Sequence, residues 1–546
     1  MVRRIGKRIR LAVGQSLGAI VFGRHLALMV AGSMVLSSSP ARAQTTSTKR
    51  SKISETSASS SSISASQTDT SASDSTAGSI RLPQPNIATQ KPRPIVDELS
   101  FFMKFESFLN REKPPAGVPD YSQIGAHVRT ESEGRIFKGT LDMGGTFATG
   151  VENYSNVYVP EAFLELQTAD FAKTEAAGGF RSRLSLGRRL EAWSTLDRNW
   201  DLGLWEPLNR FDALRPIDQG LTGAFIEVGV GKLKFIAFAS PVYIPEQGGS
   251  FSLQNGKFHT SSPWFVEPTD RLILFSETTD VQYDLATPST GSIISHASVG
   301  GLLRYGNTDE GLYLQTSYAY KPRNQLATPF ESALNLTDTT QYASVQIKPQ
   351  VIYHQLSGAE AGYAIQGEDG RHAAVSVAAL LDVPMNSDPG PNLTYQDLDP
   401  LLLLSPRVAA GLNLTKAAQL ELALSYLSST GGGFVMRGPF ATDKAVFGPR
   451  VPFREAVALD GRLTVGKGRR STFSFGGRWL EELAEDGSML SADASLDFSM
   501  NGQTQDWRVS LMSDVLGSRL PPNENIGYVS RYRGNDRWMS QLRFLF

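Results

Sequence analysis

The chain has 546 residues, 40% of them hydrophobic, with a formal net charge of -1 and no cysteine. This length implies more than one region, and the balanced charge gives no indication of a nucleic-acid partner. The lack of cysteine in the sequence excludes disulfides, thiolate metal sites and a lipid-modified N-terminal cysteine.

Residues 1–43 have the order of a secretory signal peptide. A basic start is followed by an apolar run from Leu26 to Leu36 and then by Ala41-Arg42-Ala43, which fits an A-x-A cleavage site. A membrane anchor is the alternative, but the run is too short to cross a hydrocarbon core of ~30 Å. We therefore expect export to the cell envelope.

Residues 44–95 have a low-complexity composition. They are rich in Ser and Thr, and the part from 81 to 95 is rich in proline. Such a segment cannot bury enough apolar surface to offset the loss of conformational entropy on ordering. We predict a disordered periplasmic linker.

Residues 96–119 are predicted to form a short amphipathic helix and a connector. Apolar residues at Leu99, Phe102, Phe105 and Phe108 follow a helix-like spacing. The helix could dock on another part of the protein, or it could enter or cap a barrel from the periplasm. The pattern does not distinguish these two alternatives.

Residues 120–546 contain short segments in which apolar and polar residues alternate. The segment from Leu490 to Met500 is the clearest, with Ser and Asp at every second position. In a soluble sandwich the apolar face would meet a core, and in a membrane barrel it would meet lipid while the carboxylates meet water. Both readings require an all-β protein.

The connections between these segments alternate in length. Short connections near 367–370, 415–417 and 466–469 alternate with long ones near 383–404 and 429–453. Membrane barrels have this alternation, with short periplasmic turns and longer outer loops. We predict a transmembrane antiparallel β-barrel of about 18 strands, with 16 to 20 open, around an aqueous lumen.

The chain ends in a further alternating strand. Leu542, Phe544 and Phe546 share one face, and Gln541 and Arg543 share the other. This ending resembles the C-terminal assembly signal of bacterial outer-membrane β-barrels, whose closing strand ends in an aromatic residue. The resemblance implies an outer-membrane location, contact with outer-membrane lipid and lipopolysaccharide, and insertion by the barrel-assembly machinery.

The loop at 188–220 contains the densest group of charged and tryptophan residues in the sequence. Mixed charges in a long loop suit hydrogen bonding to hydroxyls, and tryptophan faces suit sugar rings. The alternative is a folded outer loop held together by these same side chains. The candidate constriction or substrate-binding residues are Arg188, Arg189, Trp193, Asp197, Arg198, Trp200, Asp201, Trp205, Arg210, Asp212 and Arg215.

The same stretch resembles alginate-export-type and related porin barrels. The resemblance is carried by Gly187-Arg188-Arg189, by Trp200 and by the segment from Arg210 to Arg215, which reads R-F-D-A-L-R. It departs from the family pattern at Arg189, where glutamine is expected. The resemblance implies a passive conduit with a charged constriction, and alginate is not inferred as the substrate.

A second aromatic loop at 241–276 would emerge on the same side if Gly229-Val230-Gly231 is a tight turn. The two loops could then fold together over or into the lumen. Charged residues on the inward faces of strands would tune selectivity, or they would form ion pairs with one another. The candidate lumen-lining residues are Arg304, Arg462, Arg478, Asp493, Asp497 and Arg508.

Catalysis has weak support in the sequence. His296 and Ser298 share a strand face, and His259 and Ser261 have the same spacing, but no further catalytic motif accompanies them. We expect a non-enzyme without cofactor or metal. The predicted function is a porin-like channel for hydrophilic solutes, saccharides among them, with a surface scaffold and a lipid hydrolase as alternatives. The oligomeric state stays open.

Overall fold

The computed structural model describes residues 98–109, 120–133, 137–149, 155–167, 180–274, 277–336, 341–367, 370–386, 393–438, 446–447, 450–466, 471–499, 507–520 and 527–545. The predicted signal peptide and the Ser/Thr-rich linker lie outside these residues.

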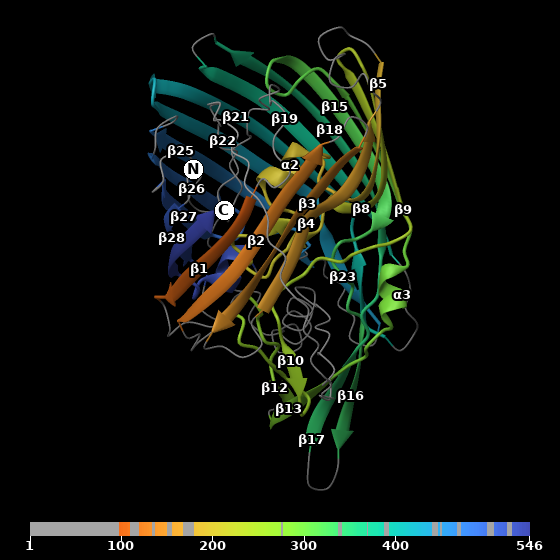
Figure 1. The fold of residues 1–546 in the computed structure, drawn as a ribbon. Helices are drawn as coiled ribbons and strands as arrows, with labels where there is room; N and C mark the ends of the chain where they lie inside the picture. Colours follow the sequence, from red (N-terminus) through yellow and green to blue (C-terminus); the bar gives the residue numbers. More distant parts are fainter. Residues whose placement is uncertain are drawn as a thin grey trace, which may run out of the picture.

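The main body is a closed antiparallel barrel of 18 strands (Figure 1). Each strand pairs with the next along the chain, and β1 pairs with β29 to close the ring. The first nine barrel strands are β1 (Glu98–Phe108), β2 (Tyr121–Glu133), β3 (Phe137–Thr149), β4 (Ser155–Gln167), β5 (Phe180–Arg189), β8 (Leu221–Val230), β9 (Leu233–Ser240), β14 (Ser298–Tyr305) and β15 (Gly311–Pro322). The other nine are β18 (Tyr353–Gln366), β19 (His372–Met385), β21 (Leu401–Thr415), β22 (Ala418–Gly431), β25 (Glu455–Val465), β26 (Ser471–Glu482), β27 (Gly487–Phe498), β28 (Trp507–Ser518) and β29 (Arg537–Leu545). The predicted all-β barrel of about 18 strands is confirmed.

The two ends of the barrel differ in the length of their connections. One end carries short turns such as 231–232 and 416–417, and the first strand begins and the last strand ends there. Gly231, with φ of 56°, makes the first of these turns possible. The other end carries long connections, including 190–220, 241–297 and 432–454. By the rule for outer-membrane barrels, the short-turn end faces the periplasm.

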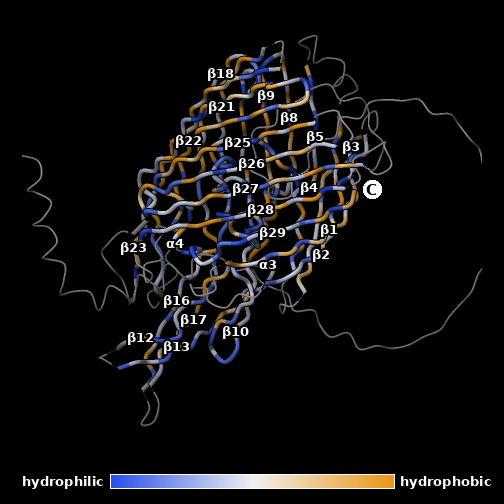
Figure 2. Tube along the Cα trace, turned by 90° about the vertical axis from the view of Figure 1, so that its left-hand side faces the viewer, coloured by the Kyte–Doolittle hydropathy of each residue, from blue (hydrophilic) through white to orange (hydrophobic). Residues whose placement is uncertain are grey.

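The outward face of the barrel is apolar. Large apolar side chains on this face are exposed, such as Leu164 at 68%, Val157 at 64% and Met103 at 62%. Their neighbours in sequence turn inward, and Figure 2 shows hydrophobic and hydrophilic positions along the strands of the wall. An apolar belt of this kind suits contact with lipid, because a protein core does not cover it.

The helix predicted within 96–119 is wrong, and the barrel does not begin at residue 120. The described part, Glu98–Phe108, is strand β1, which pairs with both β2 and β29. Phe101 and Phe105 face outward, whereas Phe102 and Phe108 are buried on the inward side. Because this strand meets apolar groups on both sides, its sequence lacks the clean alternation of its neighbours and imitates a helical stripe.

The position of Met103 in the middle of β1 gives a test of the lipid-facing side. We expect Met103→Arg to destabilise the barrel by about 2–4 kcal/mol, the cost of an arginine on the lipid face near the bilayer midplane. Ser495→Arg, on the inward face of β27 between Asp493 and Asp497, should cost much less. Urea titration of the barrel folded in lipid vesicles measures both, and equal effects would contradict the assigned faces.

The long loops carry sheets of their own at the outer end. Strands β12 (Arg271–Leu274), β13 (Glu277–Leu285), β17 (Gln341–Ile347) and β16 (Phe330–Leu336) form a four-stranded sheet that projects from the barrel (Figure 1). It has a separate apolar core that includes Val281, Val345 and Ile347. The smaller pieces are β10 (Ser252–Gln254), β11 (Lys257–His259), β20 (Tyr395–Leu398), β23 (Gly433–Arg437), β24 (Val446–Phe447), β6 (Leu208–Asn209) and β7 (Ile217–Asp218).

Helices in the described ranges are short. They are α2 (Thr195–Asn199), α3 (Thr290–Ile294) and α4 (Tyr528–Tyr532). None of the described helices has the length and apolarity needed to cross a membrane.

The closing strand has the faces predicted from its sequence. Gln541 and Arg543 are buried on the inward side, and Leu542 is 41% exposed on the outward side. The ring of Phe544 lies 4.6 Å from that of Trp507 on β28. Phe546 lies outside the described residues, so its part in an assembly signal stays a prediction.

Candidate functional site

The segment between β5 and β8, residues 190–220, lies inside the barrel. Its described polar groups bond to strands distributed around the whole ring. These bonds reach Asn156 on β4, Arg304 on β14, Gln315 and Ser317 on β15, Glu360 on β18, Ser405 on β21, Arg478 on β26, Asp514 on β28 and Arg537 on β29. We call this segment the lumen loop.

The first half of the lumen loop folds around Asp197. Ser194 caps α2 by accepting from the Asp197 N–H, a common way to satisfy a helix start. The Asp197 carboxylate accepts from the N–H groups of Leu204 (2.9 Å) and Trp205 (3.0 Å). The chain therefore returns on itself, and the rings of Trp193 and Trp205 stack at 5.4 Å with an interplanar angle of 3°.

Side chains on β14, β15 and β18 form hydrogen bonds with the start of the loop. Gln315 and Ser317 on β15 each donate to the Trp193 carbonyl, both at 3.0 Å. Arg304 on β14 donates to the Ala192 carbonyl at 3.2 Å, and Glu360 on β18 accepts from the Thr195 N–H. The backbone before α2 is thereby held on three adjacent strands.

Trp200 contacts another part of the wall, at strands β21 and β26. Its indole N–H donates to the Ser405 hydroxyl at 3.0 Å, and its ring meets Phe453 edge-on at 6.0 Å. Arg478 on β26 lies over the same ring at 5.8 Å and donates to the Asn199 carbonyl at 2.7 Å. One buried side chain thus ties α2 to two distant strands.

The second half of the loop is anchored by charges. Arg210 pairs with Glu246 in the 241–297 loop and donates to the Asp201 carbonyl at 2.7 Å. Arg215 binds Asp514 on β28, with its nearer contact at 2.8 Å. The two long loops therefore contact each other through the pair of Arg210 and Glu246.

The base of the loop holds two further candidates. Arg188 donates to the Gly220 carbonyl at 3.0 Å and so joins the two ends of the loop. Arg189 is buried and pairs with Glu191 at 3.0 Å and with Glu227 on β8 at 2.9 Å.

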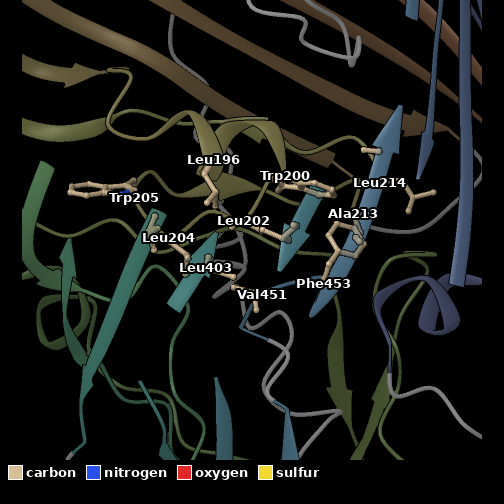
Figure 3. Packing of buried hydrophobic residues seen from close by; sticks show 14 of the residues in the cluster. Leu196, Trp200, Leu202, Leu204, Trp205, Ala213, Leu214, Leu403, Val451 and Phe453 are labelled. Carbon is tan, nitrogen blue, oxygen red and sulfur yellow. The ribbon is translucent and has the colours of Figure 1, made fainter. Parts of the chain in front are cut away.

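Apolar packing narrows the lumen at the level of the loop and towards the outer end. Trp193, Leu196, Trp200, Leu202 and Trp205 are each 1% exposed. They belong to one cluster with inward residues from most barrel strands, part of which is visible in Figure 3. Apolar loop side chains therefore occupy part of the lumen that the sequence analysis assigns to water.

The lumen on the short-turn side of this layer is lined by charged side chains. The candidate lumen-lining residues lie here or at its border, most of them in ion pairs that keep some exposure. Arg462 lies 3.7 Å from Asp493, with side-chain exposures of 18% and 12%, and Arg508 pairs with Asp497 on the next strand. Arg304 donates to Gln315 at 2.6 Å, and Arg478 lies 3.6 Å from Asp460. We call this region the charged vestibule.

The structure brings all eleven candidate constriction residues together in the lumen loop or at its base. Most of their charges are satisfied within the protein. The most exposed charged side chains among them are Arg198, at 34%, and Asp201, at 41%. Arg198 donates to Glu206 at 3.3 Å, and the Asp201 carboxylate lies 3.8 Å from Arg478.

Sequence reasoning missed the wall residues that hold the loop. Glu106, Glu360, Ser405 and Arg537 lie on strands far from residues 190–220 in the sequence. A charged residue on an inward strand face was the available signal, but the lumen contains many such residues. Contact with the loop separates these four from the rest, directly for Glu360, Ser405 and Arg537 and through Arg537 for Glu106.

Burial and neighbouring charges shift the pKa values of two carboxyl groups in the lumen loop. Burial raises the pKa of Asp197 to about 6, although the N–H groups of Leu204 and Trp205 act in the opposite sense. Burial also acts to raise the pKa of Glu191, but the charges of Lys234 and Arg189 outweigh it and lower that pKa to about 2. Asp197 therefore titrates in the range between pH 4 and 7, and Glu191 stays ionised.

The raised pKa of Asp197 predicts that packing of the lumen loop depends on pH. In a released loop its pKa returns to about 3.8, so the released loop loses its proton at lower pH than the packed loop. Raising the pH from about 4 to about 6 should therefore weaken packing of the loop, with a plateau above. Amide exchange of residues 195–206, followed across this range, measures it. Asp197→Asn should abolish the dependence, and an unchanged dependence in that variant would exclude Asp197 as its source.

His296 contacts groups other than the Ser298 hydroxyl. The ring nitrogens of His296 lie 3.0 Å from the Ser292 carbonyl and 3.4 Å from the Tyr353 hydroxyl. Ser298 instead lines a small cavity with Lys321 and Tyr243. Among the described residues, no group of three or more His, Asp or Glu side chains is placed to hold a metal ion.

Similar solved structures include several from bacterial outer membranes. A BenF-like porin from Pseudomonas fluorescens Pf-5 has 9% identity and a TM-score of 0.43, over 82% of this chain and 97% of that one. The outer membrane protein opdK from Pseudomonas aeruginosa has 10% identity and a TM-score of 0.39, over 82% and 98%. OccAB1 from Acinetobacter baumannii has 8% and 0.39, over 82% and 95%.

Similarity at this level carries no functional argument, so the proposal below rests on the geometry of the barrel. No family model matches the chain, and no curated protein matches it. The resemblance to alginate-export-type barrels finds no support in these comparisons.

Proposed function

We propose that this chain is an outer-membrane channel for the passive passage of small hydrophilic solutes. The observation that carries the proposal is a loop folded inside a closed barrel and bonded to strands around the ring. A lipid-facing belt encloses a lumen whose inner half is charged and whose middle is narrowed by that loop. A pore built this way selects by size and by polar contacts at its narrowest part.

The solutes expected are uncharged or weakly charged and rich in hydroxyl groups, saccharides among them. The partly exposed side chains of Arg198, in α2, and Asp201, just after it, present one donor group and one acceptor group to the lumen. Their opposite charges suit hydroxyl groups, which both donate and accept, better than an ion of one sign. The lipid-facing belt, in turn, would contact outer-membrane lipid and lipopolysaccharide after insertion by the barrel-assembly machinery.

Conductance of the purified protein in planar bilayers tests the channel function. Stable single-channel steps in potassium chloride are expected, together with swelling of vesicles in small sugars and exclusion of larger oligosaccharides. A folded, inserted barrel that gives no steps at any voltage would contradict the proposal.

A surface scaffold without an open pore is the second candidate. The apolar layer across the lumen and the projecting outer sheet favour it, since a scaffold needs a plugged barrel and a presented surface. Persistent absence of current, with the loop present and with the loop removed, would favour this function over the channel.

A further inference from the structure

A cluster of buried charges lies at the seam where the barrel closes. Arg537 on β29 is 0% exposed and contacts three carboxylates from three segments. Its Nη1 lies 3.2 Å from Glu106 on β1, its Nε 2.8 Å from Asp514 on β28, and its Nη2 2.8 Å from Asp212 in the lumen loop. A guanidinium can serve all three because its donors point in fixed, divergent directions.

The rest of the cluster balances its charge. Arg215 in the lumen loop donates to both oxygens of Asp514, at 2.8 and 3.1 Å. Lys104 pairs with Glu106, which also accepts from the Tyr121 hydroxyl at 2.8 Å. Three cations thus face three carboxylates. The side chains of Arg537, Glu106 and Asp514 are 0% exposed, so removing one of them would leave an unpaired charge that is costly to bury, whereas Asp212 is 19% exposed.

Aromatic residues from the outer loops cover the cluster. The ring of Trp264, in the 241–297 loop, lies 4.6 Å from the Arg537 guanidinium. Phe108 and Tyr532 pack on that same ring, at 6.4 and 5.6 Å. The cover keeps water away and strengthens the ion pairs beneath it.

From this geometry we propose that Arg537 is a positioning residue that places the lumen loop against the barrel seam. The inference rests on the proposed function of the loop as a constriction. Two of the loop's ion pairs, from Asp212 and Arg215, end on the last two strands. Arg537 is itself held by Glu106, which reaches it only when β1 and β29 are paired. The loop therefore takes its final position only in a closed barrel, and the seam sets the width of the constriction.

Asp212→Asn tests the loop side of this cluster without disturbing the seam. The asparagine keeps an oxygen to accept from the N–H groups of Leu214 and Arg215, and Arg537 keeps Glu106 and Asp514. We expect amide exchange of residues 207–220 to rise at least tenfold and the mean conductance to rise at least twofold. The unfolding temperature of the barrel should change little. Asp284→Asn, in the four-stranded sheet that projects from the outer end, is the matched control and should change neither the exchange of residues 207–220 nor the conductance.

Variants of Arg537 give a second test of its positioning role. Arg537→Met should release the loop and weaken the seam together, whereas Arg537→Lys should restore part of the exchange protection, because it returns the charge but not the forked geometry. Unchanged exchange of residues 207–220 in both Asp212→Asn and Arg537→Met would overturn the positioning role. Faster exchange in a protein that never conducts would support the positioning role and refute the channel.

Discussion

Replacing residues 190–215 by a short Gly-Ser linker is expected to increase single-channel conductance severalfold. The segment contributes Trp193, Leu196, Trp200 and Trp205 to the apolar layer across the lumen, and an apolar constriction resists the passage of water and ions. A short linker can bridge the gap, because Arg189 and Leu221 face each other on neighbouring strands. Barrels of this strand number can enclose an aqueous channel once the lumen is cleared.

Planar-bilayer recording measures this change, with vesicle swelling in sugars of increasing size as a second readout. The matched control replaces residues 328–349, the outer β16–β17 hairpin, by a linker. Its ends are also close, since the Ala327 N–H donates to the Gln350 carbonyl at 2.8 Å. That control should leave conductance near the original value. An equal rise in both variants, or none in either, would contradict a constriction by residues 190–215.

Trp200→Ala is expected to have the second largest effect. Truncating a fully buried tryptophan costs about 3–5 kcal/mol, and here that loss falls on the packed position of the loop. The variant loses the bond to Ser405, the contact with Phe453 and the surface beneath Arg478. Amide exchange of residues 195–206 should accelerate by at least two orders of magnitude, with larger and noisier current steps.

Trp538→Ala controls for the loss of a tryptophan elsewhere in the barrel. Trp538 is 55% exposed on the outward face of β29, so its truncation should leave the loop in place. Trp200→Phe keeps a ring but removes the N–H, and should fall between the wild type and the alanine variant. Slow exchange in Trp200→Ala, equal to that of Trp538→Ala, would show that other contacts hold the loop.

The sequence predicts a strand and its two faces wherever that strand separates lipid from a polar lumen. From Leu490 to Phe498 and from Gln541 to Phe544, lipid on one side and a polar lumen on the other impose alternation that is visible without a structure. The alternating lengths of the connections likewise identified the two ends of the barrel. Both signals are local, because each depends on residues next to one another in the chain.

The same reasoning failed where one of those solvents is replaced by protein. The sequence of strand β1 predicts a helix because two of its inward residues are aromatic: Phe108 packs against Trp264 of the 241–297 loop, and Phe102 lies against Gly125 on β2. The residues of the lumen loop were identified as a group, but their ion-pair partners were not.

Glu106 and Arg537 lie 431 positions apart, and Arg215 and Asp514 lie 299 apart. Barrel closure brings these pairs together, and alternation carries no information about which strands meet or what fills the space they enclose. The existence and orientation of the barrel therefore follow from local patterning. The packed layer, the seam cluster and the position of the loop follow from contacts that exist only after the ring has closed.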